Sequence, residues 1–127
     1  MAISFVHTIP ILRMFNVEKA KEFYVDYLGF QVDWEHKFPD VAPVYMRVSR
    51  GDLVLHLSEH YGDGTPGSAV YIEMQGVEEF HRELTAKNYG YLRPGLERTD
   101  WNTLCVNVID PFGNMIRFNE PVVLADC

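Results

Sequence analysis

The chain has 127 residues, of which 47% are hydrophobic and 23% charged, and its net charge is −7. This composition predicts one globular domain with its own core, and the lack of lysine and arginine clusters argues against nucleic-acid binding. No apolar run reaches the roughly 20 residues of a membrane span, and no basic segment precedes an apolar stretch at the start. We therefore expect a cytoplasmic protein with no nucleic-acid or membrane partner.

The first half of the chain predicts one helix among four strands. Asn16 is suited to cap a helix whose apolar residues recur at helical spacing from Val17 to Leu28, and Gly29 is suited to end it. β-Branched and apolar residues predict strands on both sides of this helix. The expected strands cover residues 5–13, 30–37, 44–49 and 53–58, with a tight turn at 50–52.

The second half repeats this order after a glycine-rich loop over residues 60–67. A helix is expected within residues 76–91, where Val77 opens it and the pair Gly90-Tyr91 closes it, because Val77, Phe80 and Leu84 form an apolar stripe. A Pro-Phe-Gly-Asn turn follows Asp110. Strands are expected over 68–74, near 91–92, over 101–109 and over 115–120.

This internal repeat predicts two β-α-β-β-β halves, about 4–59 and 68–120, within a single domain that covers residues 1–127. One half alone cannot bury its sheet, so the halves must pair within the chain or across a dimer. Open sheet edges and uncovered faces favour a homodimer.

The tandem halves, Phe23-Tyr24 with Leu28-Gly29-Phe30, and the turn Asp110-Pro111-Phe112-Gly113-Asn114 together resemble the vicinal-oxygen-chelate superfamily. That group contains glyoxalase I, extradiol dioxygenases, fosfomycin-resistance transferases and bleomycin-resistance proteins. Residues 55–67 and 93–101 are most similar to the bleomycin-resistance branch. The resemblance spans nearly the whole chain and implies an α+β fold whose tandem halves form a concave mixed sheet.

Members of the superfamily hold a catalytic metal with His and Glu side chains from the first and last strands of each half. The resemblance places these positions at Ile9, His56, Ala69 and Arg117. Only His56 can bind a metal, Arg117 is a permanent cation, and a catalytic site needs at least three protein donors. We therefore expect no metal, no other cofactor and no catalytic residues, which favours a binding protein over an enzyme.

A shifted metal site is the alternative. His7 shares a strand face with Ile9, and Glu73 shares one with Ala69, so His7, His56 and Glu73 would form a His/His/Glu set. A metal-dependent lyase, isomerase or dioxygenase would use this set. Two-residue spacing, however, moves a side chain about 6–7 Å along its strand, whereas metal–ligand distances tolerate about 0.2 Å.

Ligand contacts are expected on the concave face, which strand alternation makes both polar and aromatic. In bleomycin-resistance proteins aromatic side chains stack on the planar rings of the drug, and the resemblance gives this role to Trp101 with Trp34, Phe38 and Tyr45. Core packing is the alternative for Trp101, and cover of a dimer seam is the alternative for Trp34 and Phe38. The expected ligand-binding residues are Trp34, Phe38, Tyr45, His56, Tyr71, Glu73, Trp101 and Arg117.

The resemblance implies sequestration of a bleomycin-like glycopeptide antibiotic, without turnover, by a homodimer with pockets at its subunit interface. The negative net charge favours a cationic ligand. Two alternatives stay open: a metal-dependent enzyme of the same superfamily, and a pocket protein for an unrelated small metabolite.

Overall fold

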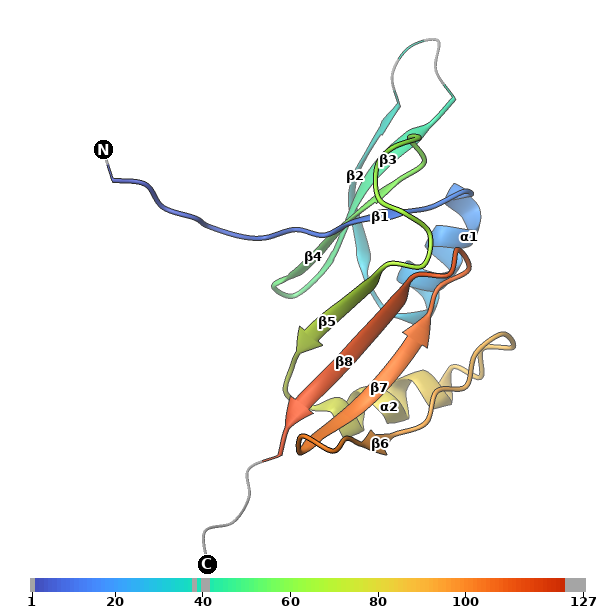
Figure 1. Cartoon of the computed structure of the whole chain (residues 1–127). Coiled ribbons are helices and arrows are strands. Elements are labelled where there is room, and N and C mark those ends of the chain that lie inside the picture. Colours follow the sequence, from blue (N-terminus) through green and yellow to red (C-terminus); the bar gives the residue numbers. More distant parts are fainter. Residues whose placement is uncertain (1, 38, 40–41, 123–127) are drawn as a thin grey trace, which may run out of the picture.

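The protein forms two four-stranded mixed sheets, as Figure 1 shows. A computed structural model describes residues 2–37, 39 and 42–122. Sheet A has the strand order β1-β4-β3-β2, and sheet B has the order β5-β8-β7-β6. Each sheet combines one parallel pair, β1 with β4 or β5 with β8, with antiparallel neighbours. The predicted α+β class with mixed sheets is confirmed.

The strands of sheet A are β1 (Ile11–Arg13), β2 (Gln31–Lys37), β3 (Val44–Arg50) and β4 (Leu53–Ser58). The first strand is therefore much shorter than the predicted 5–13. β1 pairs with β4 only over residues 11–13. One further backbone hydrogen bond, from the His56 amide to the Pro10 carbonyl, ends this pairing on the N-terminal side. Residues 2–10 belong to no strand, and Figure 1 shows this segment extending away from both sheets. His7, Thr8 and Ile9 still line a cleft with Val54 of β4 and Tyr71 of β5.

The strands of sheet B are β5 (Ala69–Glu73), β6 (Glu97–Arg98), β7 (Thr103–Ile109) and β8 (Met115–Pro121). The strand predicted near 91–92 is wrong, because this edge of the sheet is formed by the two residues of β6. Pro94 cannot donate to a strand ladder, and Gly95 beside it weakens a strand further. The chain between α2 and β6 therefore loops out.

Three helical segments pack on the sheets: α1 (Val17–Lys21), η1 (Glu22–Tyr27) and α2 (Val77–Ala86). The Asn16 side chain caps α1 by accepting a hydrogen bond from the Lys19 amide, and Gly29 follows η1 with φ +79°, both as predicted. Unexpectedly, η1 is π-helical. The apolar stripe could not predict the π-helix, because its residues lie on roughly one face whether the segment is α-helical or π-helical. No helix in the described ranges is long and apolar enough to cross a membrane.

The core lies between the helices and one face of each sheet. Strand alternation places the apolar residues on this face. The other face of each sheet, called here the open face, carries no helix. The buried apolar strand residues on this face are Leu12, Met46, Val48, Leu55 and Leu57 in sheet A and Val106, Val108, Ile116 and Phe118 in sheet B.

Candidate ligand-binding faces

Three rings cluster on the open face of sheet A. Trp34 and Tyr45 stack with their planes 14° apart and their centroids 5.9 Å apart. The His56 ring meets Trp34 edge-on at 5.5 Å, and its Nδ1 lies 2.7 Å from the Tyr45 hydroxyl oxygen. The cluster thus combines an aromatic surface with a hydrogen-bonded imidazole.

A β-bulge turns Trp34 towards this face. Val32 pairs with Val48 and Trp34 with Arg47, so Asp33 is the extra residue on β2. Strict alternation from Val32, which faces the core, would have pointed Trp34 inwards as well. A bulge re-aims the side chains that follow it, and here both Asp33 and Trp34 lie on the open face.

The charges beside the rings largely balance one another. The Asp33 carboxylate accepts hydrogen bonds from Arg47 Nε at 3.2 Å and from Ser49 Oγ at 2.9 Å. Burial, together with the charge of Arg47, lowers the pKa of His56. Burial also raises the pKa of Tyr45, with a further contribution from Asp63. The Tyr45–His56 pair therefore stays uncharged at neutral pH.

A cleft of about 320 Å³ opens beside the rings. Asp63 is held at its wall by the Ser58 hydroxyl, which donates to the carboxylate at 2.8 Å. The size is at the lower end for small-molecule sites, which favours partial rather than complete enclosure of a bulky ligand. The cleft is lined by Trp34, His36, Tyr45, His60 and Asp63.

The open face of sheet B carries a second aromatic group. Tyr71 pairs with Arg117, which pairs with Asn107, so their side chains share one row across the sheet. Trp101 precedes β7 and donates its indole N–H to the Tyr71 hydroxyl at 3.4 Å. Trp101 is 63% exposed and Tyr71 is 49% exposed. Core packing, the alternative for Trp101, does not describe a side chain this exposed.

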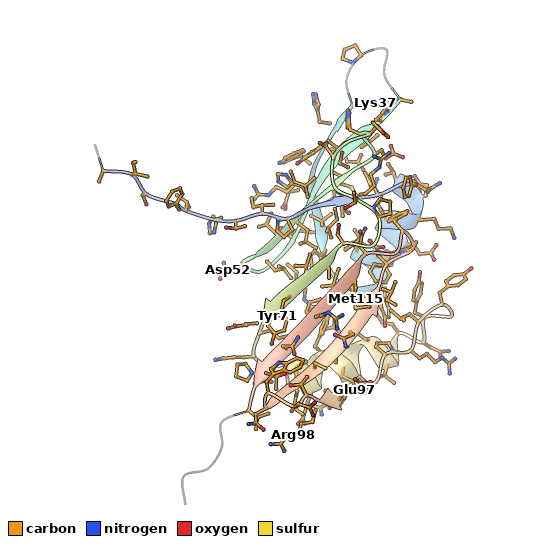
Figure 2. All side chains as sticks on the ribbon, viewed as in Figure 1. Lys37, Asp52, Tyr71, Glu97, Arg98 and Met115 are labelled. Carbon is orange, nitrogen blue, oxygen red and sulfur yellow. The ribbon has the colours of Figure 1, made fainter. Side chains whose placement is uncertain are left out.

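The predicted ligand-binding residues thus fall into separate places. Three of them lie together on sheet A and three on sheet B. In Figure 2 the label Lys37 marks β2 of sheet A and the label Tyr71 marks β5 of sheet B. Glu73 shares the parity of Tyr71, but it lines a different cleft beside α2. Phe38 lies outside the described residues. The sheet A group is Trp34, Tyr45 and His56, and the sheet B group is Tyr71, Trp101 and Arg117.

Sequence reasoning missed Asp33 and Arg47, whose ion pair lies within the sheet A group. Their contact depends on the bulge, which shifts the register by one residue. A tryptophan at a core-facing position, flanked by Asp33 and Glu35, was the available signal of this shift. Because of the bulge, the side chains of β2 do not alternate regularly between the two faces, whereas those of β4 do.

The four superfamily metal positions do not fit a divalent metal. His56 uses Nδ1 for Tyr45, Arg117 is an exposed cation, and Ile9 and Ala69 carry no donor. The shifted set is not brought together either, because His7 and Glu73 line different clefts and His56 lies in the ring cluster. Among the described residues, no three His, Cys, Asp or Glu side chains are grouped to hold a metal ion.

Comparison with known families assigns the chain. Residues 1–123 match the family described as glyoxalase superfamily protein. The chain belongs to this superfamily. No curated protein matches it.

Several solved structures share the fold of this superfamily member. The bleomycin-binding protein of Streptomyces verticillus, complexed with copper(II)-bleomycin, is 26% identical with a TM-score of 0.68, covering 95% of this chain and 100% of that one. A Streptomyces antibiotic-binding protein is 22% identical with a TM-score of 0.68, covering 96% and 99%. A glyoxalase family protein of Enterococcus faecalis is 20% identical with a TM-score of 0.67, covering 94% and 100%.

Proposed function

We propose that this protein binds a bulky, planar, cationic antibiotic of the bleomycin kind and sequesters it without chemical change. The observation that carries the proposal is the pair of aromatic groups left uncovered on the two open faces. Trp34 and Tyr45 offer a stacked surface on sheet A, and Trp101 and Tyr71 offer another on sheet B. Planar rings bind such surfaces by offset stacking.

The solved relatives support this ligand class. Two of the structures that share the fold are described as binding bleomycin or an antibiotic. The donor set at the superfamily metal positions supports binding rather than metal-assisted turnover, since three of the four side chains cannot ligate a metal. The net charge of −7 favours a cationic ligand.

The binding unit is a homodimer in which sheet A of one chain faces sheet B of its partner. In one chain each aromatic group is covered on one side only, whereas a drug-sized ligand is usually buried over most of its surface. The extended N-terminal segment supports association, because Ile3, Phe5 and Val6 are 86%, 95% and 78% exposed. Large apolar side chains exposed together indicate an interaction surface.

The two tryptophans of the chain allow each face to be observed separately. In Trp34→Phe the only indole is Trp101 on sheet B, and in Trp101→Phe it is Trp34 on sheet A. Bleomycin should quench both single-tryptophan proteins with saturation near one drug per chain. Trp101→Ala should weaken binding by about 1–3 kcal/mol, as expected for an aromatic anchor.

Tyr91→Ala is the matched control, because Tyr91 is exposed but lies beside Lys19, outside both open faces. It should leave the affinity unchanged. Light scattering on the same samples should give the mass of a dimer at micromolar concentration. A monomer would contradict the paired faces, and the absence of saturable quenching at tens of micromolar bleomycin would contradict the ligand.

A further inference from the structure

One cleft of the described part of the chain belongs to neither aromatic face. It has a volume of about 520 Å³ and lies where the tip of the β3–β4 hairpin meets the end of β5 and the first turns of α2. We call it the junction cleft. Its volume is in the range of small-molecule sites, which often form between structural units. Its apolar lining consists of Phe30, Leu53, Ile72, Met74, Phe80 and Phe118.

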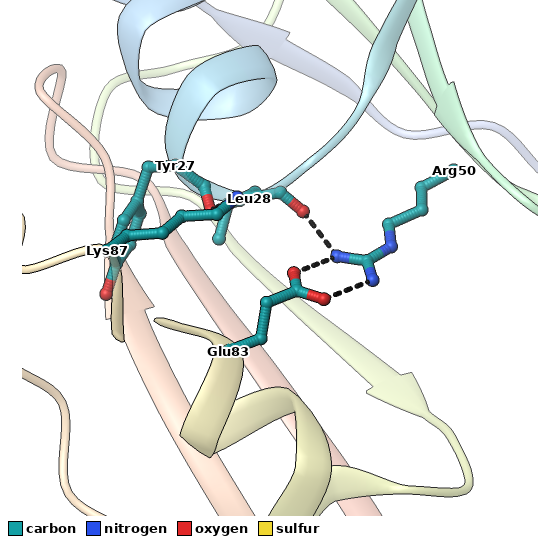
Figure 3. A network of polar contacts seen from close by, with 5 residues as sticks. All are labelled: Tyr27, Leu28, Arg50, Glu83 and Lys87. Carbon is teal, nitrogen blue, oxygen red and sulfur yellow. Dashed lines mark hydrogen bonds and ion pairs between the residues drawn. The ribbon is translucent and has the colours of Figure 1, made fainter. Parts of the chain in front are cut away.

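The junction cleft already holds one cation of the protein itself. The Arg50 guanidinium carbon lies 5.3 Å from the centroid of the Phe80 ring, and the two Nη atoms reach the Glu83 carboxylate at 2.6 and 2.9 Å (Figure 3). An aromatic face beneath and a carboxylate beside it are the two features that stabilise an organic cation. The surroundings of the Arg50 guanidinium therefore show that this cleft wall can stabilise an organic cation.

Two more carboxylates on the rim have no such partner. Glu73 and Glu79 line the junction cleft, and neither has an ion pair within the part of the chain that the structure describes. The rim thus carries three carboxylates, whereas Arg50 is the single cation among its described lining residues. This excess of negative charge favours a positively charged occupant.

An anionic occupant is disfavoured by the start of α2. Free amides at a helix start commonly bind anions. Here the amides of Gly76 and Val77 already donate to Glu120 Oε1, at 3.2 and 3.1 Å. A second carboxylate or a phosphate would therefore meet an acidic rim and two amides that already have an acceptor.

We propose that the junction cleft binds a small amphiphilic organic cation, with its apolar group against Phe80, Met74 and Phe118 and its ammonium or guanidinium group between Glu73 and Glu79. This site is independent of the proposed antibiotic-binding faces. It needs neither the dimer nor the tryptophans. Its occupant is defined by charge and by an apolar group of about the size of one aromatic ring.

Phenethylammonium is a suitable probe, and neutral 2-phenylethanol is its uncharged match. Methionine methyl NMR separates the sites, because Met74 lines the junction cleft and Met115 shares the open face of sheet B with Arg117. Phenethylammonium should shift the Met74 methyl signal saturably and leave Met115 in place. The neutral alcohol should bind more weakly.

Three substitutions test the role of charge. Glu73→Gln and Glu79→Gln should each weaken phenethylammonium binding by about two- to fivefold, the usual range for partly exposed charges. Glu78→Gln is the control, since Glu78 is exposed on the same helix turn but outside the cleft. Arg50→Gln should tighten binding, because it frees Glu83 and the Phe80 ring for the probe.

Several results would overturn the proposal. They are equal binding of the alcohol and the ammonium, weaker binding in Arg50→Gln, or a shift of Met115 without one of Met74. Bleomycin quenching of both tryptophans alongside any of these would leave the antibiotic-binding proposal intact. A retained Met74 shift without bleomycin quenching would leave the junction-cleft proposal intact and contradict the antibiotic-binding proposal.

Discussion

The two halves hold each other through corresponding hairpin tips, but with contacts of different kinds. The β7–β8 turn of the second half brings Asp110 to Tyr24 on η1 of the first half, at 2.6 Å. The β3–β4 turn of the first half brings Arg50 to Glu83 on α2 of the second half (Figure 3). The first contact is buried, whereas the Arg50 and Glu83 side chains are 39% and 38% exposed.

Burial makes the same topological contact unequal in energy. The Asp110 carboxylate accepts four hydrogen bonds: one from Tyr24, two from the amides of Phe112 and Asn114, and one from the Asn114 side chain. Asn114 also donates to the Arg13 carbonyl of β1. Burial, with the charge of Asp110, raises the pKa of Tyr24 well above its usual value, so its hydroxyl remains a donor. The bonds from Tyr24 and from both Asn114 donors to Asp110 are buried and shielded from water, whereas water competes at Arg50.

The largest effect is therefore expected from Asp110→Ala. The substitution leaves several buried donors without an acceptor, and it should lower the free energy of unfolding by about 3 kcal/mol or more. Urea unfolding followed by fluorescence measures this loss. Pro111→Ala in the same turn is the control, because Pro111 is exposed. Equal stability of the two variants would contradict a special role for the buried contact.

A milder change isolates the bond between the halves. Tyr24→Phe keeps the ring in the core and removes only the hydroxyl that donates to Asp110. The loss should be about 1–2 kcal/mol, since the acceptor belongs to a charged group that keeps its other partners. Tyr27→Phe is the matched comparison, because the buried Tyr27 hydroxyl has no hydrogen-bond partner in the described part of the chain. It should cost less than Tyr24→Phe.

These contacts show what the sequence can and cannot predict. The turn at 110–114 and the helix end at Gly29 were predicted correctly because local turn chemistry defines them. The contact between Tyr24 and Asp110 was not predicted, because the two residues are distant in sequence and no local pattern pairs them. The same motifs that identify the superfamily thus turn out to join the two halves of this chain.

The open faces were predictable only where alternation is regular. The strand β4 has the predicted bounds, and its register places His56 as expected. Trp34 depends on a bulge, which single-residue patterns do not reveal. The strand predicted from residue 5 begins only at Ile11 for another reason. Strand propensity needs backbone partners, and among the described residues the pairing with β4 ends at the Pro10 carbonyl.

The exposed contact should be worth less than the buried one. Glu83→Gln removes the charge that pairs with Arg50 and should lower the free energy of unfolding by about 0.5–1 kcal/mol. This loss should shrink further at high salt, because exposed charges are screened. Urea unfolding at low and high salt, with Glu78→Gln as the exposed control on the same helix, measures both effects. A loss as large as that of Asp110→Ala would remove the contrast between the two junctions.

The smallest effect is the dependence of the exposed contact on pH. Hydrogen bonds from Arg50, aided by the charges of Arg50 and Lys87, lower the pKa of Glu83 below its ordinary value of 4.5. A carboxyl with a lowered pKa stabilises the folded state fully above the unfolded-state value and loses this contribution as the pH falls through the folded-state value. The stability gap between the native protein and Glu83→Gln should therefore be constant at neutral pH and narrow below about pH 4.5. Other carboxyl groups are common to both proteins and cancel in the difference. A gap that stays constant down to acid unfolding would mean that Glu83 acts through its shape and not through its charge.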